Sequence, residues 1–82
     1  MSKPATRSYS RYGREAMELL GHMIRSARIE REMTSAEVAE RAGISRGLVH
    51  RIENGDAGCS IGATFEVAAI VGVRLFDAEP TT

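Results

Sequence analysis

Two arginines and a histidine lie within six consecutive residues of this 82-residue chain, at Arg46, His50 and Arg51. A guanidinium group carries parallel N–H donors, so it can bond both O6 and N7 of a guanine in the major groove of DNA. An imidazole can donate to a base acceptor or to a phosphate, with a solvated surface histidine as the alternative. Gly47 lies between them and adds no side chain, which admits close approach of the backbone. To act together, the four residues must share one exposed face.

The residues that flank this segment predict a helix with such a face. Ser45 is a suitable N-cap, and Val49 and Ile52, three apart, give the helix a buried side. The Asn-Gly pair at 54–55 ends the run. We therefore predict a helix over 46–53 with its arginines, its glycine and its histidine directed outward.

A second short helix is predicted immediately upstream. Thr34 followed by Glu37 fits a capping box, and Gly43 supplies a left-handed stop that would strain a residue with a Cβ atom. The narrow apolar stripe between them consists of Val38, Ala39 and Ala42. Two short helices joined by a tight turn are the layout that places the second helix in the major groove of DNA.

Longer helices are predicted on either side of this pair. The first spans about 12–32, and the last begins after Ser60 and runs over 61–71 until Gly72 stops it. The residues predicted to face the core are Met17, Leu20, Ile24 and Ala27 in the first helix and Ile61, Phe65, Ala68 and Val71 in the last. Because the apolar face of the first helix is broad, its first turns are expected to pack on a partner subunit.

The central pattern resembles the lambda-repressor and Cro-like helix-turn-helix family, also called Xre-type. The residues that carry the resemblance are Thr34, Glu37, Val38, Ala39, Gly43, Ile44, Ser45, Ile52, Glu53, Asn54 and Gly55. It covers roughly 20–73, and it implies an all-α, compact four-helix domain over 12–72.

The resemblance also implies roles for particular residues. In the family, the first, second and sixth positions of the recognition helix reach base edges, and here these are Arg46, Gly47 and Arg51; His50 lies on the same face. An arginine of the first helix pairs with the glutamate of the Ile-Glu-Asn-Gly run. Arg28 and Glu53 are therefore expected to form a partly buried ion pair whose role is scaffolding.

Other residues are expected to contact phosphates. Ser35 and Ser45 lie at predicted helix N-termini, where backbone N–H groups favour anions. Asn54 holds the family's other usual position for a backbone contact. Residues 1–11 are expected to form a flexible basic arm whose Arg11 touches phosphate or the minor groove, with a tail that makes no contact as the alternative.

Composition limits the class of protein. The lone Cys59 cannot form an internal disulfide, no Cys or His spacing indicates zinc, and no apolar run suggests a membrane span or a signal peptide. We therefore expect a cytoplasmic protein without cofactor or metal. The net charge is zero, but 1–31 hold seven basic and three acidic residues, whereas 32–82 hold four basic and eight acidic ones. A neutral total predicts modest DNA affinity per monomer and hence a need for dimerisation.

The segment after Gly72 departs from the common family pattern. It is rich in strand formers, so we predict a short C-terminal β-strand within 73–82 that pairs across a homodimer through Val73, Leu75 and Phe76. This ending resembles the HipB-like branch, small antitoxins that repress their own operon and bind a HipA-type kinase toxin. The resemblance implies a dimer on an inverted-repeat operator, and possible binding of a HipA-like kinase toxin.

Three other functions were weighed. A stand-alone phage or plasmid regulator of the Xre type would have much the same sequence. A protein-interaction module that binds DNA little would explain the neutral charge and the spare apolar residues, which are Leu19, Met23, Ala69 and Ile70. An enzyme is disfavoured, because His22, His50 and Cys59 have no spacing that would assemble a nucleophile and a base.

Overall fold

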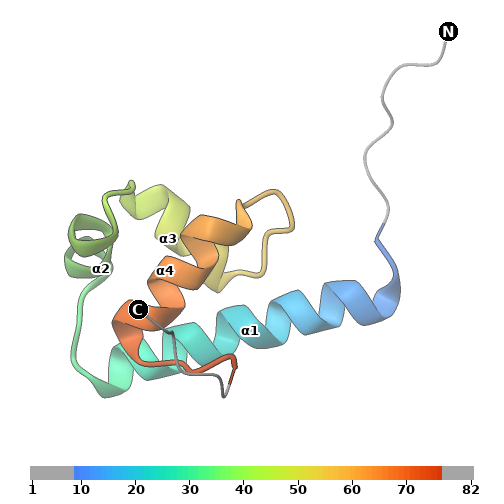
Figure 1. Cartoon of the computed structure of the whole chain (residues 1–82), viewed down its shortest axis with the longest axis horizontal. Helices are drawn as coiled ribbons and strands as arrows, with labels where there is room; N and C mark the ends of the chain where they lie inside the picture. The colour runs from blue at the N-terminus through green and yellow to red at the C-terminus, as the bar shows by residue number, and fades with distance from the viewer. Residues whose placement is uncertain (1–8, 77–82) are drawn as a thin grey trace, which may run out of the picture.

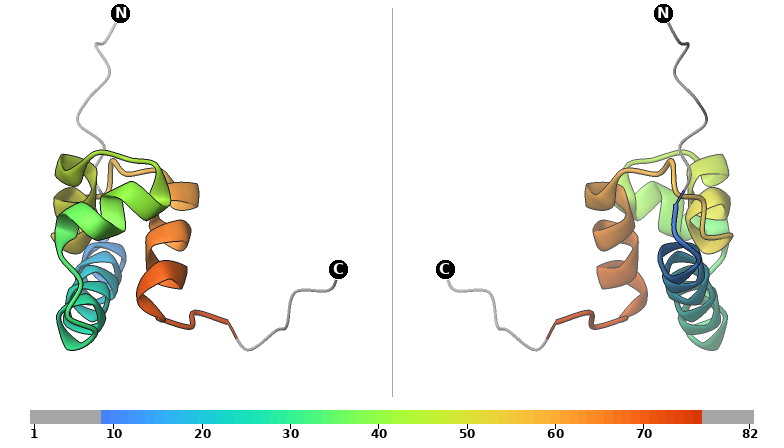
Figure 2. Two further views of the ribbon diagram at one scale, coloured as in Figure 1. Left: turned by 90° about the vertical axis from the view of Figure 1, so that its left-hand side faces the viewer. Right: turned by 90° about the vertical axis from the view of Figure 1, so that its right-hand side faces the viewer.

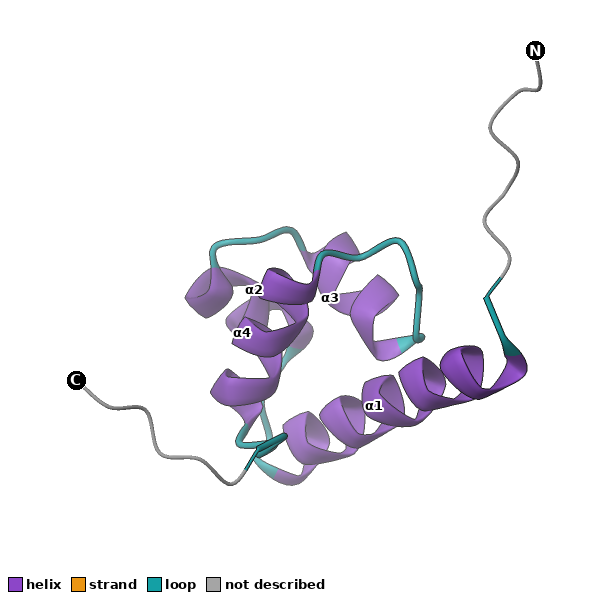
Figure 3. Cartoon of the chain, turned by 45° about the vertical axis from the view of Figure 1, so that its right-hand side comes forward, coloured by secondary structure: helices purple, strands orange, loops and turns teal. Residues whose placement is uncertain are grey.

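Four helices make up the regular structure of the chain, in a computed structural model that describes residues 9–76 (Figure 1). They are α1 (Arg11–Glu30), α2 (Ser35–Ala42), α3 (Arg46–Glu53) and α4 (Ile61–Val71). The expectation of an all-α domain is confirmed, and no strand occurs within residues 9–76 (Figure 3). Most of the expected N-terminal arm, and the tail after Phe76, lie outside the described residues.

The helices enclose one apolar core. Figure 2 shows α3 stacked over α1 on one side of the body, α4 on the other side, and α2 bridging the two. Each helix contributes to the centre: the fully buried large side chains are Ile24, Val38, Val49, Val67 and Val71. The first turns of α1 extend beyond this body (Figure 1).

Local capping fixes where the short helices begin and end. The Glu37 N–H donates to Thr34 Oγ1 at 3.0 Å, and the Thr34 N–H donates to the Glu37 carboxylate at 2.8 Å, so the predicted capping box is present. Ser45 caps α3 by accepting from the Leu48 N–H at 3.0 Å. Gly43 ends α2 at a φ of 71°, which only glycine adopts without strain. The helix-turn-helix segment is therefore specified by its own sequence.

Glycine also allows α1 and α3 to approach each other closely. Gly21, in the middle of α1, lies against the backbone at the end of α3, where an added Cβ atom would come within 2.6 Å of the Ile52 carbonyl oxygen and 2.5 Å of that of Glu53. Gly55 repeats the contact from the other side, because a Cβ there would lie 2.7 Å from Glu18 Cα. Two backbones therefore meet where neither has a side chain between them.

The boundaries of α1 differ from the prediction. The helix begins at Arg11, because Ser10 acts as an N-cap and accepts from the Gly13 N–H at 3.0 Å. It ends at Glu30 rather than near residue 32. Glu32 has a φ of 58°, and the Met33 N–H donates back to the Arg28 carbonyl at 3.0 Å, so the chain reverses there toward α2.

Part of the predicted inner face of α4 is wrong. Ala68 and Val71 are buried as expected, but Ile61 is 70% exposed and Phe65 is 40% exposed. Val67, which was not assigned to the core, is fully buried instead. The first turn of α4 is therefore less covered than its middle and end, so an apolar residue at the right helical spacing can still remain outside the core.

The predicted C-terminal strand is not found in the described chain. Val73 and Leu75 are half-buried and pack against the core of their own domain, after the Val73 N–H has closed the end of α4 by donating to Ala68 O at 2.8 Å. Phe76 is exposed, and its ring forms a T-shaped contact with that of Phe65, with 6.0 Å between the centroids. The physical reason is that a single extended segment has no neighbouring strand with which to form ladder hydrogen bonds.

The close approach of α1 and α3 gives a test of the fold. Gly21→Ala is expected to lower the free energy of unfolding by about 1–3 kcal/mol, because the added methyl group must displace backbone. Gly62→Ala is the matched control, since a Cβ there has nothing within 4 Å, and it should stabilise α4 by about 0.5–1 kcal/mol. Urea denaturation followed by circular dichroism measures both. Equal effects of the two substitutions would contradict the proposed contact.

Candidate nucleic-acid interface

The outer face of α3 carries the residues predicted to contact bases. Arg46, Gly47, His50 and Arg51 are all exposed, and at about 100° per residue they span an arc of about 140° on the helix. Val49 and Ile52 lie on the opposite side and are buried. This face combines two guanidinium groups, an imidazole and one stretch of backbone bare of side chain. It can therefore donate several hydrogen bonds to an acceptor-rich partner.

Leu48 occupies the border of this face. It is half-buried and packs against the core cluster. This packing leaves it inside the domain rather than on the outer face of α3. Ile44 also packs against the core, and so holds the turn between α2 and α3 in place.

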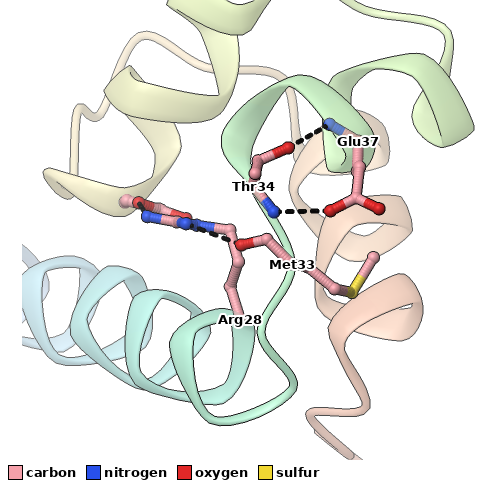
Figure 4. Close-up of polar contacts among 5 residues, drawn as sticks. Arg28, Met33, Thr34 and Glu37 are labelled. Atoms are coloured by element: carbon pink, nitrogen blue, oxygen red, sulfur yellow. Dashed lines mark hydrogen bonds and ion pairs between the residues drawn. The ribbon is translucent and has the colours of Figure 1, made fainter.

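A buried ion pair fixes the far end of α3. Arg28 of α1 donates from Nε to Glu53 Oε2 at 2.6 Å and from Nη2 to Oε1 at 3.2 Å. The two side chains are 12% and 3% exposed, respectively. The third contact of this guanidinium group runs from Nη1 to the Met33 carbonyl oxygen at 2.9 Å (Figure 4). Donation of these hydrogen bonds to Glu53 raises the pKa of Arg28 above its ordinary value, so the arginine stays charged.

The pair therefore connects three parts of the chain. Arg28 lies near the end of α1, Glu53 is the last residue of α3, and Met33 directly precedes the cap of α2 (Figure 4). No buried side-chain nitrogen or oxygen among the described residues lacks a hydrogen-bond partner. A carboxylate this buried is tolerated because it is paired bidentately.

A second ion pair was not anticipated. Arg51 donates from Nε to Asp56 Oδ2 at 2.9 Å, while Oδ1 of the same carboxylate accepts from the Gly58 N–H at 2.7 Å. The Arg51 bond lowers the pKa of Asp56, and the Gly58 bond adds to this effect. The carboxylate is therefore ionised at neutral pH, and the pair is lost only as the pH falls through that lowered pKa. No periodic rule covers a pair five residues apart across a helix end, so sequence reasoning missed Asp56.

The residues expected to contact phosphates are not brought together as one set. Ser45 and Asn54 lie at the two ends of α3, and Ser35 is the half-buried first residue of α2. Arg11 opens α1 at the opposite end of the molecule from α2, and its Nε bonds Glu15 at 3.0 Å (Figure 1). The first three lie on or beside the helix-turn-helix, whereas Arg11 lies apart from it.

An apolar groove borders the Arg51–Asp56 ion pair, because Asp56 is part of its lining. It has a volume of about 260 Å³ between the first half of α1, the loop after α3 and the start of α4, and its lining includes Met17, Leu20, Cys59, Ile61 and Phe65. Burial raises the pKa of the Cys59 thiol, which keeps it protonated and a poor nucleophile. The groove is therefore better suited to binding apolar side chains than to catalysing a reaction.

Within the part of the chain that the structure describes, no helix is both long and apolar enough to cross a bilayer. In the same part, no group of three or more His, Cys, Asp or Glu side chains is arranged to hold a metal ion.

Comparison with known protein families gives a match over most of the chain. A family model described as a helix-turn-helix domain matches residues 19–75. This span begins in α1, contains α2, α3 and α4, and ends within the segment that follows them. Comparisons with curated proteins and with solved structures gave no significant match.

The buried ion pair predicts how single and double substitutions differ. Arg28→Ala is expected to lower the free energy of unfolding by about 3–5 kcal/mol, because it leaves the Glu53 carboxylate buried without a partner. The double variant Arg28→Met with Glu53→Met removes both charges and should recover most of that loss. Chemical denaturation of the wild type, Arg28→Ala, the single variants Arg28→Met and Glu53→Met, and the double variant measures this. A double variant as unstable as the sum of its single substitutions would contradict the pairing.

Proposed function

The chain belongs to the helix-turn-helix domain family, and from this membership we propose that it is a sequence-specific transcriptional repressor that binds double-stranded DNA through α3. The observation that carries the proposal is the outer face of α3, where Arg46 and Arg51 are exposed on a helix whose other side is anchored in the core. A helix held in this way can be presented to the major groove as a rigid unit.

The proposed contacts follow from the chemistry of each side chain. Arg46 and Arg51 each donate a pair of hydrogen bonds to O6 and N7 of a guanine. His50 donates to a base or phosphate between them, and Gly47 lets the helix backbone approach the bases. A Cβ at Gly47 would have only Ser45 Oγ near it, at 3.8 Å, so the packing of the domain gives no reason for glycine there. This supports a role for Gly47 in binding a partner rather than in packing the domain.

Phosphate contacts would complete the docking of the helix. We propose that Ser35, Ser45 and Asn54 lie along the DNA backbone, since they are placed at the ends of α2 and α3. Arg11 would reach DNA only from the protruding start of α1, together with the residues before it.

We further propose that the protein acts as a homodimer on an inverted repeat. One recognition helix of eight residues contacts few base pairs, and a twofold-related pair doubles the site. The exposed apolar side chains that support a second subunit are Ile61, Phe65 and Phe76, which lie along α4 and the segment after it. Val73 and Leu75 would lie beneath this contact, and the strand predicted after Gly72 would form only by pairing with its copy.

The narrower proposal is an antitoxin of the HipB-like branch, which represses its own operon and binds a HipA-like kinase toxin. The apolar groove beside Met17 and Phe65 supports a protein partner in addition to DNA. A stand-alone regulator of the Xre type needs no such partner. The two are distinguished by whether a HipA-like kinase encoded beside this chain binds it in a purified mixture.

Base contact by Arg46 predicts a specific loss. Arg46→Ala is expected to weaken binding to the DNA upstream of the protein's own operon by about 1–3 kcal/mol while the helical content stays unchanged. Arg31→Ala is the charge-matched control, because Arg31 is an exposed arginine at the C-cap of α1 rather than on α3. Mobility shifts at two salt concentrations measure both. Equal losses for the two variants would indicate attraction by charge alone, without base contact.

The proposed dimer face predicts a change in association. Phe76→Ser should raise the dissociation constant of the dimer by at least about tenfold, because it removes an exposed aromatic anchor from the interface. Tyr12→Ser alters an exposed aromatic residue in the first turn of α1, which the sequence suggested as a subunit contact; with the contact on α4 and the segment after it, this change should leave association unchanged. Sedimentation equilibrium gives both values. An effect of Tyr12→Ser alone would place the subunit contact on α1 instead.

A further inference from the structure

We propose that Asp56 is a specificity-determining residue, which holds Arg51 by its Nε atom so that only the two terminal nitrogens of the guanidinium group remain to read a guanine. The inference rests on the proposed function and deepens it. It concerns a loop residue after the recognition helix, one that lies outside the base-contacting positions of α3.

The first step is the fixed position of the carboxylate. Oδ1 of Asp56 accepts from the Gly58 N–H at 2.7 Å, so the side chain is tied to the backbone of its own loop. The loop is itself joined to α3, because the Asp56 N–H donates to the Arg51 carbonyl at 3.0 Å. The acceptor is therefore set relative to the helix before any partner arrives.

The second step is the geometry at the arginine. Asp56 Oδ2 accepts from Arg51 Nε at 2.9 Å. Within the described residues, Nη1 and Nη2 of Arg51 form no hydrogen bond. The Arg51 side chain is 54% exposed. These two nitrogens are the terminal ones of the guanidinium group. Their parallel N–H donors match the O6 and N7 acceptors of guanine. The side-on alternative, which uses Nε together with one Nη, is blocked by the carboxylate.

The third step is the space left for this arrangement by Gly58. A Cβ atom at Gly58 would come within 3.2 Å of Asp56 Oδ1 and 3.4 Å of Arg51 Nη2. Glycine thus provides the N–H that anchors the carboxylate and keeps its surroundings open. Carboxylate, arginine and glycine form a single arrangement at the end of α3.

The consequence is opposite effects on specific and non-specific binding. An arginine without Asp56 can rotate about its side-chain bonds and donate to phosphates or to several base patterns, which weakens its preference for guanine. Asp56 also places a negative charge beside the DNA surface, so its removal should strengthen attraction to any duplex. If Asp56 only stabilised the fold, its removal would weaken specific and non-specific binding together.

The experiment selects sites from a randomised duplex DNA library with the full chain, then measures binding to duplexes that carry guanine or adenine at each selected position. The position read by Arg51 is the one at which Arg51→Ala abolishes the preference. The wild-type protein should prefer guanine there by roughly 5- to 150-fold. Asp56→Ala should reduce that preference at least about threefold and bind random duplex more tightly than the wild type does.

Two further variants make the result decisive. Asp56→Asn keeps an acceptor of the same shape without the charge, and it should retain more of the preference than Asp56→Ala. In a chain that already carries Arg51→Ala, the Asp56→Ala change should have no effect on base preference. Because Asp56 is exposed, Asp56→Ala and Asp56→Asn should both keep the wild-type midpoint of thermal unfolding. If Asp56→Ala alone fails to fold, Asp56→Asn carries the comparison against the wild type.

The outcomes separate the inference from the function on which it rests. An unchanged guanine preference in Asp56→Ala overturns the role of Asp56 while DNA recognition stands. The same holds if Arg51→Ala alters no selected position, since Arg46 would then account for the readout. If the wild-type chain selects no sequence at all, the proposed function fails, and the inference fails with it.

Discussion

The hydrogen-bonded ion pair between Arg28 and Glu53 is the interaction on which the rest of the structure depends. It ties the end of α1 to the end of α3 and, through the Met33 carbonyl, to the chain that enters α2. An eight-residue helix such as α3 is too short to be stable alone in water, so its position has to come from tertiary contacts. The Arg28–Glu53 pair provides a tertiary contact of fixed direction, since a bidentate guanidinium–carboxylate contact tolerates little rotation.

Glycines, together with the ion pair, determine how α1 and α3 are placed relative to each other. Gly21 and Gly55 let the backbones of α1 and α3 approach until no side chain fits between them, which sets the separation of the two helices as the ion pair sets their orientation. Gly47 is different, because it lies exposed in α3 with open space around it. A glycine in a helix interior costs about 0.5–1 kcal/mol relative to alanine. Packing explains that cost at Gly21, whereas at Gly47 the proposed approach to DNA explains it.

The distribution of charge and apolar surface supports two kinds of contact on one small domain. Arginines occupy the outer face of α3, and the acidic residues at and just after its end are paired, Glu53 with Arg28 and Asp56 with Arg51. The zero net charge of the chain therefore says little about this face, because binding depends on local potential. The apolar groove is formed by α1, α4 and the loop after α3; it begins beside the Arg51–Asp56 pair and shares Ile61 and Phe65 with the proposed dimer face. A repressor that also binds a second protein would use the arginine face for DNA and this neighbouring groove for the protein.

The sequence by itself determined the helix ends, where a capping side chain or a glycine acts on backbone groups of its own segment. The capping box of Thr34 and Glu37, the serine caps of α3 and α4, the bounds of α3 and the left-handed turns at Gly43 and Gly72 were all predicted, because each is satisfied within its own segment. The Arg28–Glu53 pair was expected only because the chain resembles a known family. Tertiary structure alone decided the contact at Gly21, the exposure of Ile61 and Phe65, the inward packing of Val73 and Leu75, and the pairing of Arg51 with Asp56. The physical reason is that these depend on how far one helix extends past another and where a loop returns, and no local spacing encodes either.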